Sequence, residues 1–350
     1  MKQRGRLVLI ILVAVISIAL IVWALSNIGR TRGKTTRGTS ADRYDTGPIT
    51  DPPAPALTVR LLDVGQGDAT YIHNGDSRVI IDGGPDAGRF GALLDSLGLN
   101  NTTIDVVVLT HQHYDHYNGL MALFDSKRHI TVRYVFENKD AATATTLARL
   151  RDSIVARAQR DGLIYRDTDD PCANGTAACT ITMRGGAKLH IMRPLPPPEK
   201  ANNRSVAIAL YGADSSAFSM WLAGDAEHDE IAYFESQGDL RPGSHVDVLK
   251  ADHHGSCNGV TERYLTLLHP SWVVASLGAQ NEYGHMHEQA KQVYSAAHVP
   301  WYRTDQNGTI TIRSPGTPGG KYSIAVGRGT QNMNGPSDRT SHQQECAAME

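Results

Sequence analysis

A group of histidines that directly follows a short apolar run constrains this chain most strongly. Residues 104–109 are mainly β-branched and apolar, which predicts a buried strand. His111 and His113 come next and lie two positions apart, so in extended backbone both rings leave the same side and can bind one metal ion. Asp115 and His116 follow and face elsewhere, which suits a second metal nearby. The sequence therefore predicts a metal centre at the end of this strand.

The alternative is a solvated polar loop that happens to be rich in histidine. Three imidazoles and a carboxylate within six residues are costly to crowd together unless a cation offsets their desolvation and repulsion. Asp225 ends another apolar run, and His253 and His254 follow a third, which strengthens the metal interpretation. Adjacent histidines in a turn point in different directions, so we expect His254 to bind metal and His253 to lie behind the ligands.

A carboxylate placed between two divalent ions and flanked by imidazoles forms a two-metal hydrolytic site. We expect Asp225 to bridge the two metals, rather than only to cap the turn after its strand. The other expected ligands are His111 and His113 for the first metal and Asp115, His116 and His254 for the second.

A glycine-bearing loop after a further apolar run carries His285 and His287. We expect one of them to contact the substrate or to protonate the leaving group, with a structural histidine as an equal alternative. The expected catalytic residues are Asp115, Asp225 and His285. The residues expected near the substrate are Asn202, Ser205, Ser256 and His287. The carboxylates expected to be structural are Asp63, Asp68 and Asp82.

The N-terminal segment resembles a membrane span. Residues 7–25 are apolar except for Ser17, and 19 residues at about 1.5 Å each reach roughly 28 Å, close to the hydrocarbon thickness of a bilayer. The segment is either an uncleaved anchor or a long signal peptide, and its length favours the anchor. Basic residues flank it on both sides, so charge counting does not decide its orientation. The expected organisation is an anchor or signal segment at 1–25, a flexible linker at 26–56, a folded domain at 57–327 and a disordered tail at 328–350.

The spacing of the cysteines indicates the cellular compartment of the domain, and its net charge indicates whether it binds nucleic acid. Cys172 and Cys179 bracket a turn-rich stretch that a disulfide would close in an oxidising compartment. We therefore expect the domain outside the cytoplasm, and secreted if the N-terminal segment is cleaved, while Cys257 and Cys346 have no evident partner. The formal net charge is −2, but without the seven basic residues before position 38 the chain has 27 basic and 36 acidic residues. An acidic body disfavours tight nonspecific binding of nucleic acid.

Apolar and alternating runs predict the remaining elements. Strands are expected at 57–64, 69–73, 78–84, 188–192, 205–211, 220–225, 246–251 and 272–277. Helices are expected at 90–97, 120–124 and 141–159, and a cysteine-bearing loop at 167–186. The succession of strand, helix and strand predicts an α/β fold.

Several of these motifs, in this order, resemble the metallo-β-lactamase superfamily. The run from His111 to His116 carries the resemblance together with Asp225 and His254. More narrowly, the chain is similar to the hydrolase-like domain of ComEC-type competence proteins at residues 62–69, 81–84, 222–225, 249–256, 283–287 and 302–308. The similarity covers residues 57–326. It implies an αββα four-layer sandwich, a binuclear zinc or manganese site and phosphodiester hydrolysis, with DNA as the expected substrate.

The chain also departs from these relatives. It has one candidate membrane span, so the transport channel of full-length competence proteins is not expected, and the resemblance does not imply DNA uptake. No Gly-His-x-Pro-Gly-His stretch lies between His116 and Asp225, where thioesterases and lactonases of the superfamily carry a further ligand for the first metal; residues 202–205 lie near that place instead. We therefore expect the first metal to be held less tightly or completed by water. Asp225 stands where true β-lactamases carry Cys, and together with Asp115 and His116 this argues against antibiotic hydrolysis.

The sequence thus predicts a membrane-tethered, extracytoplasmic two-metal hydrolase whose nucleophile is a hydroxide bridging the metals. Phosphodiesters suit hard, charged metals, and the acidic body favours a smaller phosphoester over long nucleic acid. Two alternatives stay open: a thioester or lactone hydrolase, and a noncatalytic, metal-stabilised accessory module of DNA capture or surface assembly. Such a module would not need an open two-metal centre.

Overall fold

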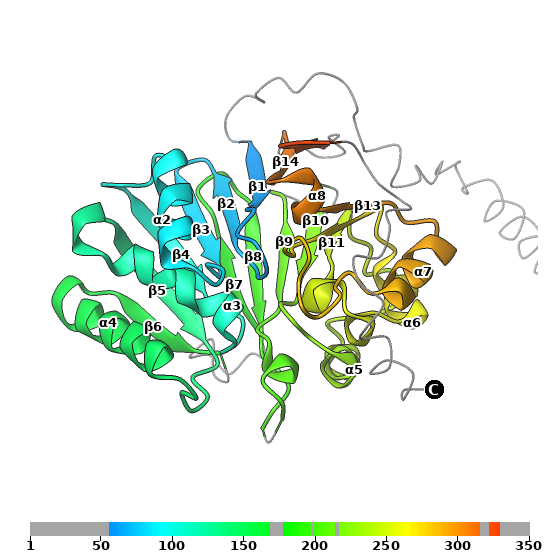
Figure 1. Cartoon of the computed structure of the whole chain (residues 1–350), viewed down its shortest axis with the longest axis horizontal. Coiled ribbons are helices and arrows are strands. Elements are labelled where there is room, and N and C mark those ends of the chain that lie inside the picture. The colour runs from blue at the N-terminus through cyan, green and yellow to red at the C-terminus, as the bar shows by residue number, and fades with distance from the viewer. Residues whose placement is uncertain (1–55, 169–177, 198, 214–216, 316–321, 330–350) are drawn as a thin grey trace, which may run out of the picture. The chain divides into compact units, whose positions relative to one another are not determined.

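Two β-sheets packed face to face form the framework of the domain (Figure 1). The computed structural model describes residues 56–168, 178–197, 199–213, 217–315 and 322–329. Within these residues the first sheet has eight strands in the order β15-β14-β1-β2-β3-β4-β5-β6. The second has seven strands in the order β13-β12-β11-β10-β9-β8-β7.

The first sheet is antiparallel on one side and parallel on the other. Its strands are β1 (Leu57–Leu61), β2 (Thr70–Asn74), β3 (Ser77–Ile81), β4 (Thr103–Val108), β5 (Thr131–Glu137), β6 (Ile164–Asp167), β14 (Ile310–Ser314) and β15 (Ser323–Val326). Pairing is antiparallel from β15 through β14, β1 and β2 to β3. It is parallel from β3 to β6, where helices can cross between the strands.

The second sheet has the same mixed character. Its strands are β7 (Ala178–Thr182), β8 (Lys188–Met192), β9 (Ile208–Tyr211), β10 (Ser219–Leu222), β11 (Val248–Lys250), β12 (Trp272–Ala275) and β13 (Trp301–Arg303). Strands β7 to β10 pair antiparallel, and β10 to β13 pair parallel. The carboxyl ends of β10, β11 and β12 therefore lie at one edge of the sheet, where α/β proteins place their functional loops.

Helices connect the strands and cover the sheets. The α-helices are α2 (Ala87–Ser96), α3 (Tyr114–Tyr117), α4 (Thr145–Asp161), α5 (His228–Gln237), α6 (Glu262–Leu268), α7 (Glu288–Ala296) and α8 (Thr304–Asn307). The 3-10 helices are η2 (Asn118–Phe124), η3 (Ser126–Arg128), η4 (Asn202–Arg204), η5 (Asp252–Gly255) and η6 (Cys257–Gly259).

Three groups of buried apolar side chains define the layers. Between the sheets, Val59 and Val106 of the first sheet share a core with Met220 and Val248 of the second. On the outer face of the first sheet, α2 and α4 pack against β3, β4 and β5, with Phe90 buried there. On the outer face of the second sheet, α5, α6 and α7 pack against β10, β11 and β12. The order helix, sheet, sheet, helix confirms the predicted αββα sandwich.

Burial of the strands follows their place in these layers. Alternate residues of β1 are buried, as in a strand with one face toward a core. All residues of β11 and β12 are buried, because both faces of these central strands are covered. This double burial explains why they appear in the sequence as continuous apolar runs that lead directly to polar loops.

Several predicted elements differ in the structure. The expected helix at 120–124 is the 3-10 helix η2, and the short helix α3 precedes it. The expected loop at 167–186 contains β7 at its end, because residues 178–182 pair with β8. The expected helix at 141–159 is α4, which begins at Thr145.

The predicted N-terminal anchor and the cysteine bridge fall mainly outside the described part of the chain. Residues 7–25 are not among the described residues, and none of the described helices has the length and apolar composition needed to span a membrane. Cys172 also lies outside, so its pairing with Cys179 stays a prediction. Neither Cys179 nor Cys257 is a free thiol, although the sequence offered no evident partner for Cys257.

The packed part of the domain extends past the predicted end at residue 327. The Arg328 guanidinium donates to Asp63 Oδ2 at 3.0 Å and to the Thr304 carbonyl at 3.2 Å. Arg328 therefore belongs to the folded domain, and Asp63 has the structural role predicted for it. Residues 330–350 lie outside the described part.

Candidate metal centre

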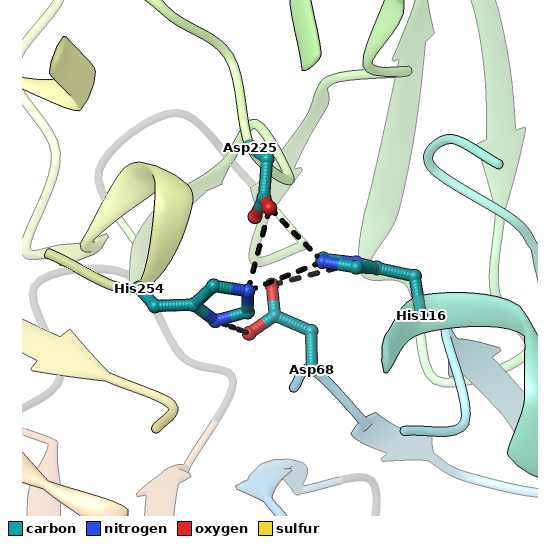
Figure 2. A group of neighbouring side chains, drawn as sticks. All are labelled: Asp68, His116, Asp225 and His254. Carbon is teal, nitrogen blue, oxygen red and sulfur yellow. Dashed lines mark hydrogen bonds and ion pairs between the residues drawn. The ribbon is translucent and has the colours of Figure 1, made fainter. Parts of the chain in front are cut away.

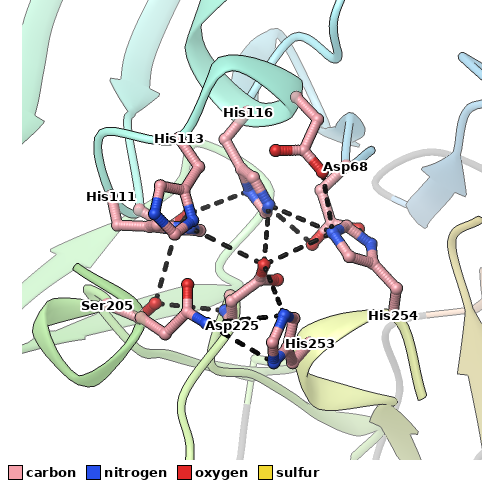
Figure 3. Close-up of polar contacts among 12 residues, drawn as sticks. Asp68, His111, His113, His116, Ser205, Asp225, His253 and His254 are labelled. Atoms are coloured by element: carbon pink, nitrogen blue, oxygen red, sulfur yellow. Dashed lines mark hydrogen bonds and ion pairs between the residues drawn. The ribbon is translucent and has the colours of Figure 1, made fainter. Parts of the chain in front are cut away.

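The loop between β4 and α3 brings His111 and His113 together (Figure 3). His111 Nε2 lies 3.1 Å from His113 Nδ1 and 3.6 Å from Asp225 Oδ2. Ligand atoms of these three residues lie within 4.8 Å of one another, a spacing that one metal ion can bridge. The geometry matches the first metal position predicted from the sequence.

A second group of ligand atoms converges beside the first. His116 Nε2 and His254 Nε2 are 3.3 Å apart, and Asp225 Oδ2 lies 3.2 Å from the first and 3.3 Å from the second. Asp115 Oδ2 lies 3.2 Å from His254 Nε2. Figure 3 shows the His116 and His254 rings turned toward the Asp225 carboxylate. All four residues predicted for the second metal therefore meet at one place.

Asp225 is the residue that the two groups share. It follows β10, its side chain is almost fully buried, and one oxygen faces imidazoles of both groups. The preceding Gly224 permits this position: its φ is +59°, and a Cβ there would lie 2.8 Å from the Thr110 Cβ. A carboxylate that reaches two groups of imidazoles has the placement of a bridging ligand.

The outer nitrogens of the second group are fixed by hydrogen bonds. His116 Nδ1 donates to Asp82 Oδ2 at 2.8 Å, and His254 Nδ1 donates to the Ser276 carbonyl at 2.8 Å. Asp82 also accepts from the Thr110 backbone N–H at 2.9 Å and from the Thr110 hydroxyl at 2.7 Å. These contacts leave each Nε2 free for a metal, as carboxylate–histidine pairs do in metal sites. Asp82 is thus structural, as predicted, and supports the centre.

Asp68, which was expected only to tie a turn, instead contacts the histidines of the second group. Its carboxylate lies 3.3 Å from His254 Nδ1 and 4.0 Å from His116 Nδ1 (Figure 2). Together with His116, Asp225 and His254 it forms a group whose ligand atoms lie within 4.8 Å of one another, so Asp68 is a further candidate ligand that the sequence did not indicate. The ammonium group of Lys250, at the end of β11, pairs with Asp68 and donates to the Gly224 carbonyl at 2.7 Å. Both side chains are buried. Lys250 was not predicted to be part of the site.

The turn at η5 separates the roles of two adjacent histidines. His253 and His254 both have left-handed backbone, with φ values of 47° and 56°, so their rings leave the turn in different directions. His254 enters the buried centre, whereas His253 is held outside it, with Nδ1 3.3 Å from Glu227 Oε1 and Nε2 4.0 Å from Asp225 Oδ2. The predicted choice of His254 as the ligand agrees with this geometry.

In the metal centre, neighbouring charges shift the pKa of the buried groups in the direction opposite to the effect of burial. Burial raises the pKa of Asp225, but the positive charges of His116 and His254 outweigh it and hold that pKa well below its ordinary value. Burial lowers the pKa of both histidines, yet the nearby carboxylates raise it well above the ordinary range: Asp225 first, then Asp82 for His116 and Asp68 for His254. The centre therefore stabilises positive charge where the Nε2 atoms meet.

The donor set fits divalent cations. Four carboxylates and one ammonium group surround the imidazoles, so with neutral rings three negative charges remain uncompensated; these groups belong to Asp68, Asp82, Asp115, Asp225 and Lys250. Two divalent cations would bring this charge close to neutrality. Burial, followed by the charge of His116, lowers the pKa of His111 well below its ordinary value, which favours the neutral ring that binds metal.

Two residues expected near the substrate instead support the framework. The buried Ser205 hydroxyl accepts from the Asp225 backbone N–H at 3.1 Å and lies 3.4 Å from His111 Nδ1, so it orients two ligands. The buried Ser256 hydroxyl accepts from the Asn258 backbone N–H at 3.3 Å and begins η6. Sequence reasoning could not find these contacts, because a serine in a loop gives no signal of its partner.

Asn202 and His287, the other two residues expected near the substrate, also form hydrogen bonds within the protein. Asn202 donates to Glu227 Oε1 at 2.8 Å and lies over the His253 ring rather than at the metals. His287 Nε2 donates to the Tyr283 carbonyl at 3.0 Å, and its Nδ1 accepts from the Cys257 backbone N–H at 3.2 Å. Its ring therefore closes the loop, which corrects the expected substrate contact.

An open cavity of ≈ 290 Å³ lies over the metal centre. His285, which was expected to contact the substrate or to protonate the leaving group, lines this cavity. Burial and then the charges of His254 and His253 lower its pKa well below the ordinary value. A neutral His285 can exchange hydrogen bonds with a substrate. The cavity is lined by Gln66, His113, Tyr114, Asp115, Asp225, His253, His254, Tyr283 and His285.

Comparison with known proteins finds one matching family model and a distant relative. Residues 62–187 match the family model of the metallo-beta-lactamase superfamily, and this part of the chain resembles that superfamily. The chain resembles ComEC-type proteins: it is 24% identical over 282 residues to ComE operon protein 3 of Bacillus subtilis (strain 168). That match covers 73% of this chain and 33% of the relative, so the chain spans about a third of the relative's length.

The chain is also similar to solved structures of low sequence identity. The metallo-beta-lactamase fold protein YhfI from Bacillus subtilis has 15% identity and a TM-score of 0.43, with 68% of this chain and 94% of that chain covered. Igni18, a metallo hydrolase from the archaeon Ignicoccus hospitalis, has 16% identity and a TM-score of 0.44, with 73% and 98% covered. The short form of human tRNase Z has 13% identity and a TM-score of 0.38, with 62% and 91% covered.

Proposed function

We propose that this domain is a binuclear metal-dependent hydrolase that cleaves phosphodiesters. The position of Asp225 carries the proposal, because its carboxylate belongs to both groups of ligand atoms. A structural metal site is closed by protein ligands, whereas this one opens into a cavity. The arrangement thus supports a catalytic centre over the noncatalytic module.

The side chains of the centre have distinct tasks in such an enzyme. His111 and His113 would hold one cation and Asp115, His116 and His254 the other, with Asp225 shared. Bound there, divalent cations supply Lewis-acid stabilisation of developing negative charge and activate water. Behind them, Asp82 and Ser205 fix ring orientations.

The charge of the cavity favours a phosphodiester over a thioester or lactone. Among the described residues that line it there is no lysine or arginine, so an anionic substrate group must be neutralised by the bound cations. Phosphodiester cleavage develops charge on oxygens, which hard cations stabilise well. The same lining lacks the basic track that proteins use to follow a long nucleic-acid backbone, which supports a short phosphoester.

A panel of three substrates tests this choice. The full-length protein, loaded separately with zinc and with manganese, is given three substrates in turn. These are bis(p-nitrophenyl) phosphate, a thioester whose released thiol is detected with a thiol reagent, and a simple lactone. We expect metal-dependent turnover of the phosphodiester above both others, and loss of that turnover in His111→Ala. Preferred cleavage of the thioester or lactone would overturn the phosphodiesterase proposal.

We further propose that residues 7–25 tether the domain to the membrane and that it works outside the cytoplasm. The apolar length of this segment supports the tether, and the spacing of Cys172 and Cys179 supports an oxidising compartment. A reporter enzyme that is active only outside the cytoplasm, fused after residue 350, is expected to be active in the membrane fraction. A silent reporter that is still made at full length would refute the orientation.

A further inference from the structure

Two exposed tyrosines stand at the mouth of the metal cavity. Tyr114 is 54% exposed and Tyr283 is 48% exposed, the highest values among the large apolar side chains in the described part of the chain. Tyr114 begins α3, and Tyr283 lies in the loop between β12 and α7, so they come from distant parts of the sequence. Both line the same cavity. Exposed aromatic surface at a binding site is available to stack on a flat ligand.

Neighbouring rings support both tyrosines. The Tyr283 ring stacks on His285, with centroids 5.5 Å apart and planes at 24°. His285 in turn stacks on the metal-group residue His254, at 5.7 Å and 30°. Tyr114 packs edge-on against the buried ring of Tyr117 at 5.9 Å. A series of rings therefore leads from the mouth of the cavity to the ligands.

Two polar atoms in the cavity wall have no partner in the described part of the protein. His285 is only 4% exposed, yet its Nδ1 makes no hydrogen bond there. Gln66 accepts from the Gly278 backbone N–H through Oε1, but its buried Nε2 also lacks a partner. An unpaired buried polar atom destabilises the free protein, and a ligand that supplies the missing hydrogen bond removes that penalty.

We infer that Tyr114 and Tyr283 form a stacking site for a nucleobase whose adjoining phosphodiester reaches the metal centre. The inference rests on the proposed function and specifies its substrate class as a nucleotide diester with an unpaired base. Tyrosine faces accept any base, because every base has a π-face. The unpaired His285 Nδ1 and Gln66 Nε2 are then available to the sugar-phosphate or to the edge of the base.

The size and charge of the cavity restrict the ligand to one or two nucleotides. Its ≈ 290 Å³ lies at the lower end of the range for small-molecule sites. Polymer-binding sites combine stacking with a positively charged groove, and no lysine or arginine is among the described residues of this lining. A sugar phosphate without a base would leave the two tyrosine faces in water.

Binding of an uncleavable probe tests the inference separately from catalysis. The metal-loaded full-length protein is titrated with a phosphorothioate dinucleotide and with the same probe lacking both bases. We expect the base-containing probe to bind more tightly, and Tyr283→Ala and Tyr114→Ala each to weaken only that probe, by roughly 5- to 150-fold. Tyr114→Phe and Tyr283→Phe should retain tight binding of the base-containing probe, since the aromatic ring is kept.

Tyr211→Ala is the matched control, because Tyr211 is also an exposed tyrosine (38%) but lies on β9 and does not line the cavity. It should bind both probes as the wild type does. Equal affinity of the wild type for the two probes would overturn the inference, as would equal weakening of both probes by the Ala variants. Base-dependent binding without turnover of any phosphodiester would refute the proposed activity and leave the stacking site standing.

Discussion

Replacing Asp82 with asparagine is expected to weaken metal binding by roughly 10- to 100-fold without unfolding the domain. The buried Asp82 carboxylate accepts from the Thr110 backbone N–H at 2.9 Å, the Thr110 hydroxyl at 2.7 Å and His116 Nδ1 at 2.8 Å. Asparagine has the same size but only one acceptor oxygen, and its other terminal group donates. It cannot accept all three bonds, so the His116 ring loses its fixed tautomer or its orientation.

The size of the effect follows from the contact that is lost. A hydrogen bond to a charged group contributes about 1.5–3 kcal/mol. Each 1.4 kcal/mol corresponds to about a factor of ten in affinity. Loss of one such bond to His116 therefore corresponds to a weakening of metal binding by roughly 10- to 100-fold. This is the usual effect of removing a hydrogen-bond partner of a metal ligand.

Competition with a chromophoric chelator measures the affinity of the full-length protein for zinc and for manganese. Thermal unfolding in excess chelator shows separately whether Asp82→Asn still folds. Asp105→Asn is the control, because the Asp105 carboxylate also accepts a backbone hydrogen bond, from Arg78 at 3.0 Å, but lies within β4 away from the centre. The reasoning is refuted if Asp82→Asn binds metal within about twofold of the wild type, or if the control loses as much.

Three further changes have defined outcomes. Lys250→Met leaves Asp68 buried without its cation and should lower the free energy of unfolding by about 3–5 kcal/mol in denaturant titration. The double variant Lys250→Met/Asp68→Leu should be less destabilised than the single variant. A single variant as stable as the wild type would contradict the role of this ion pair. Because nearby carboxylates raise the pKa of His116 and His254, metal binding at about pH 7.5 should displace protons from these rings, and metal affinity should fall as the pH is lowered. Calorimetry in buffers of different ionisation enthalpy measures the number of protons released on metal binding, and a value of zero would contradict this prediction. Thr261→Ala removes the side-chain cap of α6 and should destabilise the domain by about 1 kcal/mol while leaving metal affinity unchanged.

The side chains predicted as ligands lie close together because they follow strands. His111, His113, Asp225 and His254 come directly after apolar runs, and strands that pair in parallel bring their carboxyl ends to one edge. Spacing within the run also placed Asp115 beside the second group. The succession of strands and helices predicted the α/β class, and the αββα sandwich was implied by the family resemblance.

The supporting contacts could not be predicted in the same way. Asp68 lies in a glycine-rich turn and Lys250 ends a buried strand, so their pairing depends on how the two sheets pack rather than on local pattern. A lysine within an apolar run was the available signal, since a buried cation needs a nearby anion. Ser256 and His287 were misassigned because their loops use these side chains to satisfy their own backbone N–H and C=O groups.

Counting bound metal against turnover tests the central claim most directly. The full-length wild type and Asp225→Ala are stripped with chelator and titrated with zinc and with manganese, while bound metal and hydrolysis of bis(p-nitrophenyl) phosphate are followed together. We predict that wild-type turnover rises until two ions are bound per chain, and that Asp225→Ala binds less metal and loses turnover. Turnover that survives chelation, or that Asp225→Ala retains at the wild-type level, would contradict a hydrolytic centre built around this shared carboxylate.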